Sequence, residues 1–206
     1  MLKNRFFITA LIFSACIGSV LLFRALKVGA VLPSAEQRTR GDKKAPIQIT
    51  EYFDYQCPPC ANARKLLEDR MKERPGEIHL EVRYFPLSGH MNSLKAAVHA
   101  ECAARQGAFW KFHDEVFSHQ SEWATDPYAE LKFLTYVQSI GIDLKKWDTC
   151  TKDPAVAEFV QGEKKQGETL GLTTTPSFFV NGKLVVGVFP FIEEVKQLES
   201  RIEQRS

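Results

Sequence analysis

The sequence predicts an α/β fold in which a β-α-β unit and a β-β-α unit are separated by a block of helices. Two strand-like stretches, 47–53 and 78–85, enclose a helical pattern over 61–74. Helical periodicity then dominates from residue 93 to residue 170, and strand patterns return only from residue 176. The chain is therefore expected to combine a small sheet with an inserted helical domain.

The first unit has a signal at each of its boundaries. Residues 47–53 alternate and then run apolar, which is typical of a buried strand. Pro75 and Gly76 end the helix, and the alternating stretch 78–85 ends at Pro86. A strand, a helix and a strand of this length form a βαβ unit, whose strands pair in parallel through a right-handed crossover.

The second unit is a hairpin followed by a helix. The pair Asn181-Gly182 separates the apolar stretches 176–180 and 183–187, which favours a tight turn, and an amphipathic pattern follows over 190–203. In the helical block, Asp153 before Pro154 predicts a capped helix start. The helices predicted in that block span 93–106, 109–119, 128–140, 144–150 and 154–170.

Composition limits the function classes. The chain has 206 residues, 44% of them hydrophobic, so one domain with a sizeable core and an appendage can form. The formal net charge is only +2, and the basic residues are scattered along the chain. Nothing in this balance indicates a nucleic-acid partner.

The N-terminal segment differs from the rest of the chain. Residues 6–23 are uncharged and mostly apolar, follow a short basic stretch, and are just long enough to span a bilayer core. We expect an uncleaved signal anchor; cleavage after Ala30 and lipidation at Cys16 are the alternatives. All three place the domain outside the cytoplasmic membrane, in the cell envelope (periplasmic or extracytoplasmic). The predicted divisions are 1–24 as anchor or signal peptide, 25–45 as linker, 46–88 and 171–206 as the two parts of the core, and 89–170 as the helical insert.

Cys57-Pro58-Pro59-Cys60 is the motif with the clearest chemistry. It lies between the first strand and the first helix, where two sulfurs three residues apart can meet on one helical face. The first turn of a helix stabilises a thiolate and lowers its pKa, which suits a dithiol that cycles with a disulfide. An inert structural disulfide and a metal site are the alternatives. A zinc site needs a second ligand pair, and no further C-x-x-C or H-x-x-x-H pattern follows.

Four segments in this order resemble the DsbA-type thiol:disulfide oxidoreductases, in the branch that includes membrane-tethered bacterial members. The resemblance covers about residues 45 to 203. It implies a thioredoxin-like core with a helical insert and no organic cofactor or metal. The segments are EYFDYQCPPC at 51–60, YFPLSGH at 84–90, AECAARQGAFW at 100–110 and TTPSFFVNG at 174–182.

The resemblance also implies roles for individual residues. Cys57 matches the nucleophile with an exposed thiolate, and Cys60 matches its buried resolving partner. Pro176 matches a cis-proline that faces the disulfide, and X-Pro is the only common cis bond. A proline that opens a strand leaves the backbone of Thr175 able to pair with an extended substrate. An ordinary trans proline is the alternative.

Three further side chains are candidates near the dithiol. Glu51 matches a buried acid of the family, which would take the proton of Cys60 when the mixed disulfide resolves. A solvent-facing residue at a strand edge is the alternative for Glu51. Asp54 is closer to Cys57 in sequence and is expected in the loop. His90 is expected in a loop near the active-site face, either tuning Cys57 or only capping that loop.

Cys102 and Cys150 lie on separate predicted helices of the insert. Related proteins of this branch have a similar second disulfide, so we expect a structural bond between them. An even number of cysteines behind an export signal agrees with an oxidising compartment. A second redox pair that passes electrons to the first is the alternative.

The expected function is that of an exported enzyme that exchanges disulfides with unfolded or partly folded protein thiols, in the oxidising direction. Its turnover needs a membrane redox partner, a quinone-linked oxidase or a reductase. The direction stays open, because Pro58-Pro59 lacks the histidine of the strongly oxidising prototype and Thr175 resembles the isomerase branch. An isomerase that forms oligomers through residues 25–45 and a dithiol factor that handles copper or zinc are the competing functions.

Overall fold

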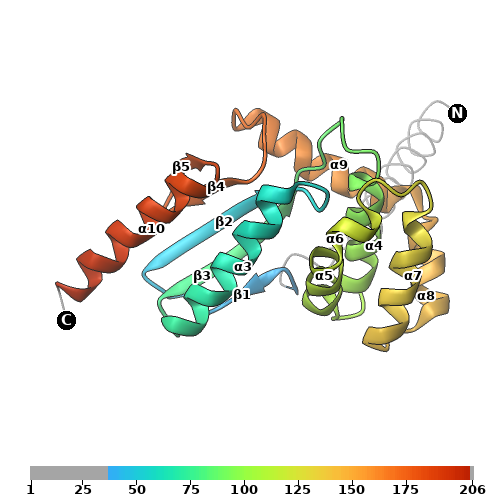
Figure 1. Cartoon of the computed structure of the whole chain (residues 1–206), viewed down its shortest axis with the longest axis horizontal. Helices are drawn as coiled ribbons and strands as arrows, with labels where there is room; N and C mark the ends of the chain where they lie inside the picture. The colour runs from blue at the N-terminus through green and yellow to red at the C-terminus, as the bar shows by residue number, and fades with distance from the viewer. Residues whose placement is uncertain (1–36, 205–206) are drawn as a thin grey trace, which may run out of the picture. The chain divides into compact units, whose positions relative to one another are not determined.

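The computed structural model describes residues 37–204, which form a mixed five-stranded sheet with helices around it (Figure 1). The order of the strands across the sheet is β1-β3-β2-β4-β5. The strands are β1 (Thr39–Arg40), β2 (Ile47–Phe53), β3 (Ile78–Tyr84), β4 (Ser177–Val180) and β5 (Lys183–Val186).

The predicted βαβ unit is confirmed. β2 and β3 pair in parallel, in register from Ile47 opposite Ile78 to Phe53 opposite Tyr84. On its other side β2 pairs antiparallel with β4, and β4 pairs antiparallel with β5 through the Asn181-Gly182 turn. β2 is therefore the central strand, with a hydrogen-bonded neighbour along both of its edges.

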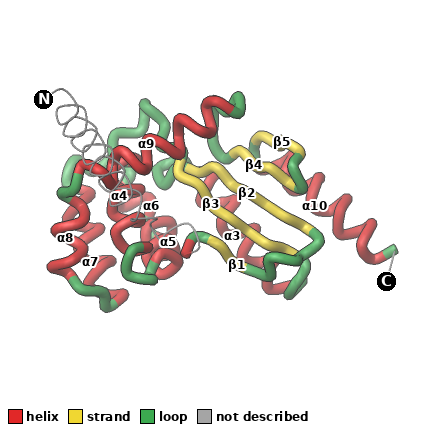
Figure 2. The backbone as a smooth tube through the Cα atoms, turned by 180° about the vertical axis from the view of Figure 1, so that it is seen from behind, coloured by secondary structure: helices red, strands yellow, loops and turns green. Residues whose placement is uncertain are grey.

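Two helices cover one face of this sheet. Figures 1 and 2 show α3 (Pro58–Glu73) against the strands, in front of them in one view and behind them in the other. α10 (Val188–Glu203) joins the same layer, where the ring of Phe191 stacks on Phe178 of β4 with centroids 3.9 Å apart. α3 begins directly after Cys57, because prolines at the first helical positions lose no hydrogen bond.

The remaining helices form the insert, which packs at one end of the sheet (Figure 1). Aromatic rings fill its core: Phe133 contacts Trp123 and Phe112 with ring centroids 5.1 Å and 6.3 Å apart. Asp153 caps the last of these helices as predicted, accepting a hydrogen bond from the amide of Ala155. These helices are α4 (Ser93–Ala104), α5 (Phe109–Ser118), α6 (Gln120–Trp123), α7 (Ala129–Ile140), α8 (Leu144–Thr151) and α9 (Pro154–Thr169).

The expectation of a linker over residues 25–45 is wrong for its last part. Thr39 and Arg40 form β1, which pairs antiparallel with β3 at the sheet edge. Arg38 is 1% exposed, because its guanidinium pairs with Glu163 of α9. The local sequence did not predict this strand, because the stretch is charged and Glu163, which pairs with Arg38, lies 125 residues further along the chain.

The predicted anchor over residues 6–23 lies outside the described residues. Within residues 37–204, no helix combines the length and the apolar character that crossing a membrane requires. The sequence also missed α6, a helix of four residues that is too short to show a period.

A disulfide joins Cys102 of α4 to Cys150 of α8. The bond closes a loop with a sequence separation of 48 residues, and it links two helices of the insert. Such a crosslink removes conformations from the unfolded chain, and in the chain-entropy model a loop of this size contributes up to about 4 kcal/mol to the free energy of unfolding.

We expect the double variant Cys102→Ala/Cys150→Ala to fold with a free energy of unfolding lowered by roughly 2–4 kcal/mol. Urea denaturation of the variant and of the wild-type chain measures this difference. Unchanged disulfide exchange in the variant would agree with a structural bond. A loss of exchange with little loss of stability would instead make this pair a second redox centre.

Candidate active site

The two cysteines of the motif are free thiols that lie at the start of α3. Cys60 is fully buried and Cys57 is 5% exposed. The expectation of an exposed sulfur at Cys57 is therefore corrected, because the loop before β4 covers it. In this dithiol form the thiol of Cys57 donates a hydrogen bond to the carbonyl oxygen of Thr175, with 3.4 Å between the sulfur and the oxygen.

The two thiols differ sharply in acidity. The hydrogen bond from the Cys60 thiol is the main cause that lowers the pKa of Cys57 to about 6. The side chain of Thr175 lowers this pKa further, while burial opposes the shift. Burial raises the pKa of Cys60 well above its ordinary value. At neutral pH the arrangement therefore holds one thiolate, at Cys57, next to one protonated thiol.

We expect this acidity to appear in the stability of the reduced protein. A group whose pKa falls on folding stabilises the fold above its unfolded pKa, and this contribution is lost as the pH falls through the folded pKa. For Cys57 that window runs from 9.0 down to about 6. As the pH rises through this window, the free energy of unfolding of the reduced form should therefore increase, relative to that of the oxidised form, by roughly 1.4 kcal/mol for each pH unit. Urea denaturation of both forms at several pH values tests this, and parallel profiles would contradict it.

Glu51 lies in β2 and is 3% exposed. Burial, and then the negative charge at Cys57, raise the pKa of the Glu51 carboxyl to about 8. The alternative of a solvent-facing residue at a strand edge is wrong, because β2 is the central strand. A carboxyl with such a pKa can take up and return a proton near neutral pH.

The peptide bond between Thr175 and Pro176 is cis, and β4 begins at the next residue. The amide of Gly187 donates a hydrogen bond to the carbonyl oxygen of Pro176, at 2.9 Å, so the loop is fastened to the end of β5. The side-chain oxygen of Thr175 is buried and makes no hydrogen bond with the described residues in this dithiol form. That hydroxyl is available to donate to the Cys57 sulfur once it is a thiolate.

Side chains of the insert hold the loop that carries Cys57. The side-chain nitrogen Nε2 of Gln120 donates to the carbonyl oxygens of Tyr55, at 2.7 Å, and of Cys57, at 3.1 Å. The Tyr55 hydroxyl shares a hydrogen bond with Nδ1 of His113, at 3.2 Å. Sequence reasoning missed Gln120, because only the folding of α6 against the loop brings it there.

A sequence profile of a family described as thioredoxin matches residues 34–200 of this chain. The chain belongs to the thioredoxin family. Its described residues have the thioredoxin-like sheet and the helical insert found in DsbA-type proteins, as the resemblance implied.

Several solved structures share this thioredoxin-like fold. Oxidised BdbD from Bacillus subtilis has a TM-score of 0.70 and 20% sequence identity, over 81% of this chain and 93% of that one. Alpha-DsbA1 from Wolbachia pipientis has a TM-score of 0.66 and 23% identity, over 82% and 94%. A thioredoxin-like oxidoreductase from Silicibacter pomeroyi has a TM-score of 0.66 and 24% identity, over 85% and 99%.

The curated relatives that this thioredoxin-family chain matches are named as Na(+)/H(+) antiporters. Na(+)/H(+) antiporter NhaA 1 from Mycobacterium sp. (strain KMS) is 36% identical over 167 residues, which are 78% of this chain and 26% of the antiporter. NhaA 3 from Salinispora tropica is 32% identical over 145 residues, 70% of this chain and 21% of the antiporter. The chain thus spans about a quarter of these relatives or less.

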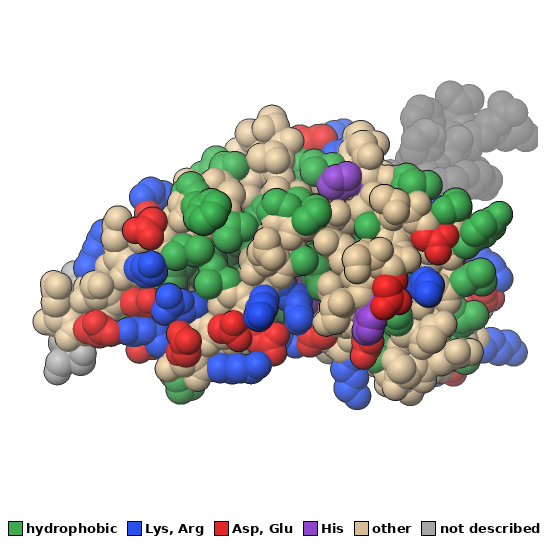
Figure 3. All heavy atoms as spheres, viewed as in Figure 1, with side chains coloured by type: hydrophobic (Ala, Val, Ile, Leu, Met, Phe, Trp, Pro, Cys, Tyr) green, Lys and Arg blue, Asp and Glu red, His purple; other side chains and the backbone are tan. Residues whose placement is uncertain are grey.

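Apolar side chains gather on one face of this thioredoxin-family domain, between the start of α3 and the start of α10 (Figure 3). Phe189, two residues after the Gly187 that binds Pro176, is 84% exposed. Val186 at the end of β5 is 45% exposed. An exposed apolar surface close to the dithiol suits contact with apolar stretches of another polypeptide.

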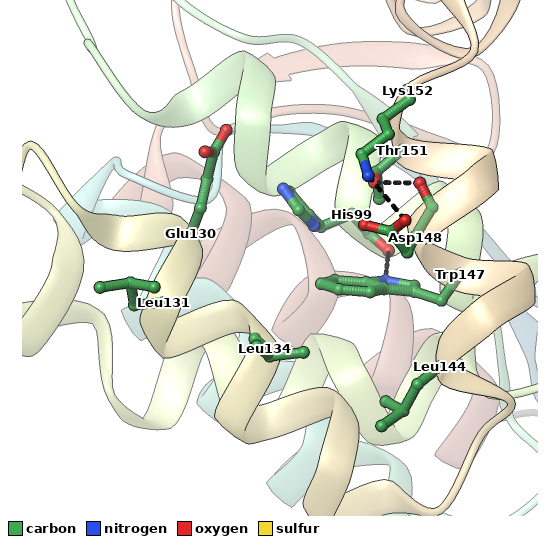
Figure 4. A pocket seen from close by; sticks show the side chains of 9 residues that line it. All are labelled: His99, Glu130, Leu131, Leu134, Leu144, Trp147, Asp148, Thr151 and Lys152. Carbon is green, nitrogen blue, oxygen red and sulfur yellow. Dashed lines mark hydrogen bonds and ion pairs between the residues drawn. The ribbon is translucent and has the colours of Figure 1, made fainter.

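A cavity of about 480 Å³ lies in the insert and is lined by residues from α4, α7 and α8 (Figure 4). His99 and Trp147 lie at its floor, and Leu131 and Leu134 line the side formed by α7. Burial is the main cause that lowers the pKa of His99, to about 4, so this imidazole is neutral at pH 7. None of the residues that line this cavity belongs to the loop of Cys57.

Within residues 37–204, no three histidine, cysteine or acidic side chains are grouped closely enough to hold a metal ion. The chemistry that the described site offers is that of its two sulfurs, the buried Glu51 carboxyl and the cis-proline loop.

Proposed function

We propose that this chain is an exported thiol:disulfide oxidoreductase that oxidises protein thiols through Cys57 and Cys60. The observation that carries the proposal is the unequal acidity of the two buried thiols beside the cis-proline loop. Because the Cys57 thiolate is stabilised, the reduced form of the pair is favoured, and the oxidised form therefore tends to transfer its disulfide to substrates.

The reaction consists of two exchange steps. A substrate thiolate attacks the sulfur of Cys57, the Cys57–Cys60 bond breaks, and Cys60 leaves as a thiolate that takes up a proton. A second thiolate of the substrate then attacks the substrate sulfur in the mixed disulfide and releases Cys57 as its stable thiolate. The substrate loses two electrons and gains one disulfide, and the protein gains these electrons as its dithiol.

Glu51 is the group we assign to the proton of Cys60. When protonated, its buried carboxyl can donate to the departing Cys60 sulfur, and when ionised it can remove the proton in the reverse direction. The raised pKa of Glu51, about 8, allows both states near neutral pH.

We expect Glu51→Gln to slow exchange by roughly 10-fold or more, because a proton must then reach Cys60 through water. The pH dependence of stability should change as well. A carboxyl whose pKa rises on folding stabilises the fold below its unfolded pKa, and this contribution is lost as the pH rises through the folded pKa. For Glu51 this loss of stability runs from pH 4.5 to about pH 8, and it should be absent in the variant. Stopped-flow exchange kinetics and urea denaturation across this range measure both effects. An unchanged exchange rate would remove Glu51 from the mechanism.

The cellular setting is also a proposal. An apolar segment over residues 6–23 supports an anchor that holds the domain outside the cytoplasmic membrane. Turnover as an oxidase then requires a membrane partner that reoxidises the dithiol. An isomerase or a reductase of the same fold is the second candidate, favoured by Thr175 before the cis-proline. A factor that binds copper or zinc through the dithiol is a weaker third candidate.

The deciding experiment is the redox equilibrium of the full chain with glutathione, with Cys57→Ala as the control. A strongly oxidising equilibrium with fast oxidation of a reduced unfolded protein supports the oxidase. A much more reducing equilibrium supports the isomerase or the reductase. Absence of any exchange, with metal retained after purification, would overturn the proposed enzyme function.

A further inference from the structure

The carboxylate of Asp54 lies at the start of the loop that carries Cys57 and is completely buried. One oxygen, Oδ1, accepts hydrogen bonds from the amide of Gln56, at 2.7 Å, and from the hydroxyl of Ser93, at 2.6 Å. The other oxygen, Oδ2, accepts from the amide of Leu87, at 2.8 Å, and bonds Nδ1 of His90, at 2.7 Å. A single side chain thus joins this loop to the segment 87–93, which leads into α4.

Each oxygen of Asp54 accepts a hydrogen bond from one backbone amide. A backbone amide can only donate, and the hydroxyl of Ser93 and Nδ1 of His90 bond the same two oxygens at short distances. An ionised carboxylate offers about four acceptor sites and no donor, whereas an asparagine side chain replaces one oxygen with a donating NH₂ group. An asparagine at position 54 would therefore place its NH₂ group against one of the two backbone amides that donate to this anchor.

Asp54 and the nucleophile belong to the same turn of the backbone. The amide of Cys57 donates to the carbonyl oxygen of Asp54, at 3.1 Å, so the two residues are the ends of one tight turn. The Asp54 carboxylate raises the pKa of Cys57, and it thereby opposes the larger, lowering effect of the Cys60 thiol.

We propose that Asp54 is a positioning residue of this site: its carboxylate fixes the Cys57 loop to the insert, and its charge limits how far the Cys57 thiolate is stabilised. The inference rests on the proposed function only where it connects thiolate stability to the redox equilibrium. It also gives His90 a role, as a partner that bonds the charged carboxylate on the side away from the loop backbone.

The insert provides a matched control for this charge. Gln120 holds the same loop through two hydrogen bonds to carbonyl oxygens, but it carries no charge. Both variants remove hydrogen bonds that hold the loop. Gln120→Leu changes no formal charge, whereas Asp54→Asn removes a carboxylate. A purely structural role predicts that both variants change the Cys57 titration in the same direction.

The test is the ultraviolet titration of the Cys57 thiolate in the full chain, together with the glutathione equilibrium. We expect Asp54→Asn to lower the midpoint of the titration and to shift the equilibrium toward the reduced protein by about 3- to 10-fold. Gln120→Leu should leave the midpoint unchanged or raise it. A midpoint that rises or stays constant in folded Asp54→Asn, or that falls equally in both variants, would overturn the proposal.

A measurement on the wild-type chain covers the case in which Asp54→Asn does not fold. The ¹³C resonance of the Asp54 carboxyl carbon should shift as Cys57 titrates, and this step should be missing in Cys57→Ala. A resonance that is insensitive to Cys57 would overturn the proposal. None of these three readouts uses a protein substrate. A chain that fails to oxidise substrates but shows both shifts would contradict the proposed function and leave the role of Asp54 intact.

Discussion

Replacing Cys57 with serine is expected to abolish disulfide exchange, whereas replacing Cys60 with serine should trap the chain as a mixed disulfide with its substrates. Cys57 has the lowered pKa, about 6, and is the less buried of the two sulfurs, so it receives the attack. In the reverse reaction the Cys57 thiolate attacks a disulfide of the substrate, and without Cys60 the chain has no neighbouring thiol that can release the bound substrate.

Incubation of each reduced variant with a protein that contains disulfides, followed by mass spectrometry under non-reducing conditions, measures both outcomes. The double variant Cys102→Ala/Cys150→Ala is the matched control, because it removes two cysteines that are not in the site. If Cys57→Ser were the variant that traps substrates and Cys60→Ser were inert, the assignment of the nucleophile would be reversed.

The second large effect concerns the buried ion pair between Arg38 and Glu163. Their side chains are 1% and 3% exposed, and two parallel hydrogen bonds of 2.6 Å and 2.7 Å join them. Glu163 also accepts a hydrogen bond from the amide of Tyr84, at 3.0 Å. The pair thus connects the residue before β1, helix α9 and the end of β3.

We expect Glu163→Gln to lower the free energy of unfolding by about 3–5 kcal/mol, because the buried Arg38 guanidinium would lose both short hydrogen bonds and keep only the more distant Glu101 carboxylate, at 4.0 Å. Urea denaturation measures this loss. Asp148→Asn is the control, since it breaks an exposed pair with Lys152 whose contribution should be below about 1 kcal/mol. Equal effects in the two variants would mean that the buried pair contributes no more than a surface pair.

Local sequence patterns were sufficient to predict most of the core. The alternation in 47–53 predicted β2 to the residue, and the turn at Asn181-Gly182 predicted the hairpin, because both signals depend on neighbouring residues. The apolar surroundings of Glu51 in the same stretch were the basis for expecting its burial.

Contacts between distant segments account for what the sequence did not predict. β1 has two residues, and its pairing with β3 has no local pattern. Asp54 was expected in the loop, but its anchoring role depends on Ser93, 39 residues further along the chain. His90 was expected either to tune Cys57 or only to cap its loop, and its bond to Asp54 depends on the pairing of β2 with β3.

The loop 54–57 has a consequence for protein engineering. Each of its four residues bonds a residue beyond position 86, through contacts with Ser93, His113, Asn92 and Gln120. Exchanging the Cys-x-x-Cys motif between relatives would transfer the sulfurs but leave behind the groups that orient them. A chimera should therefore exchange the loop together with α4, α5 and α6, since these parts form one module.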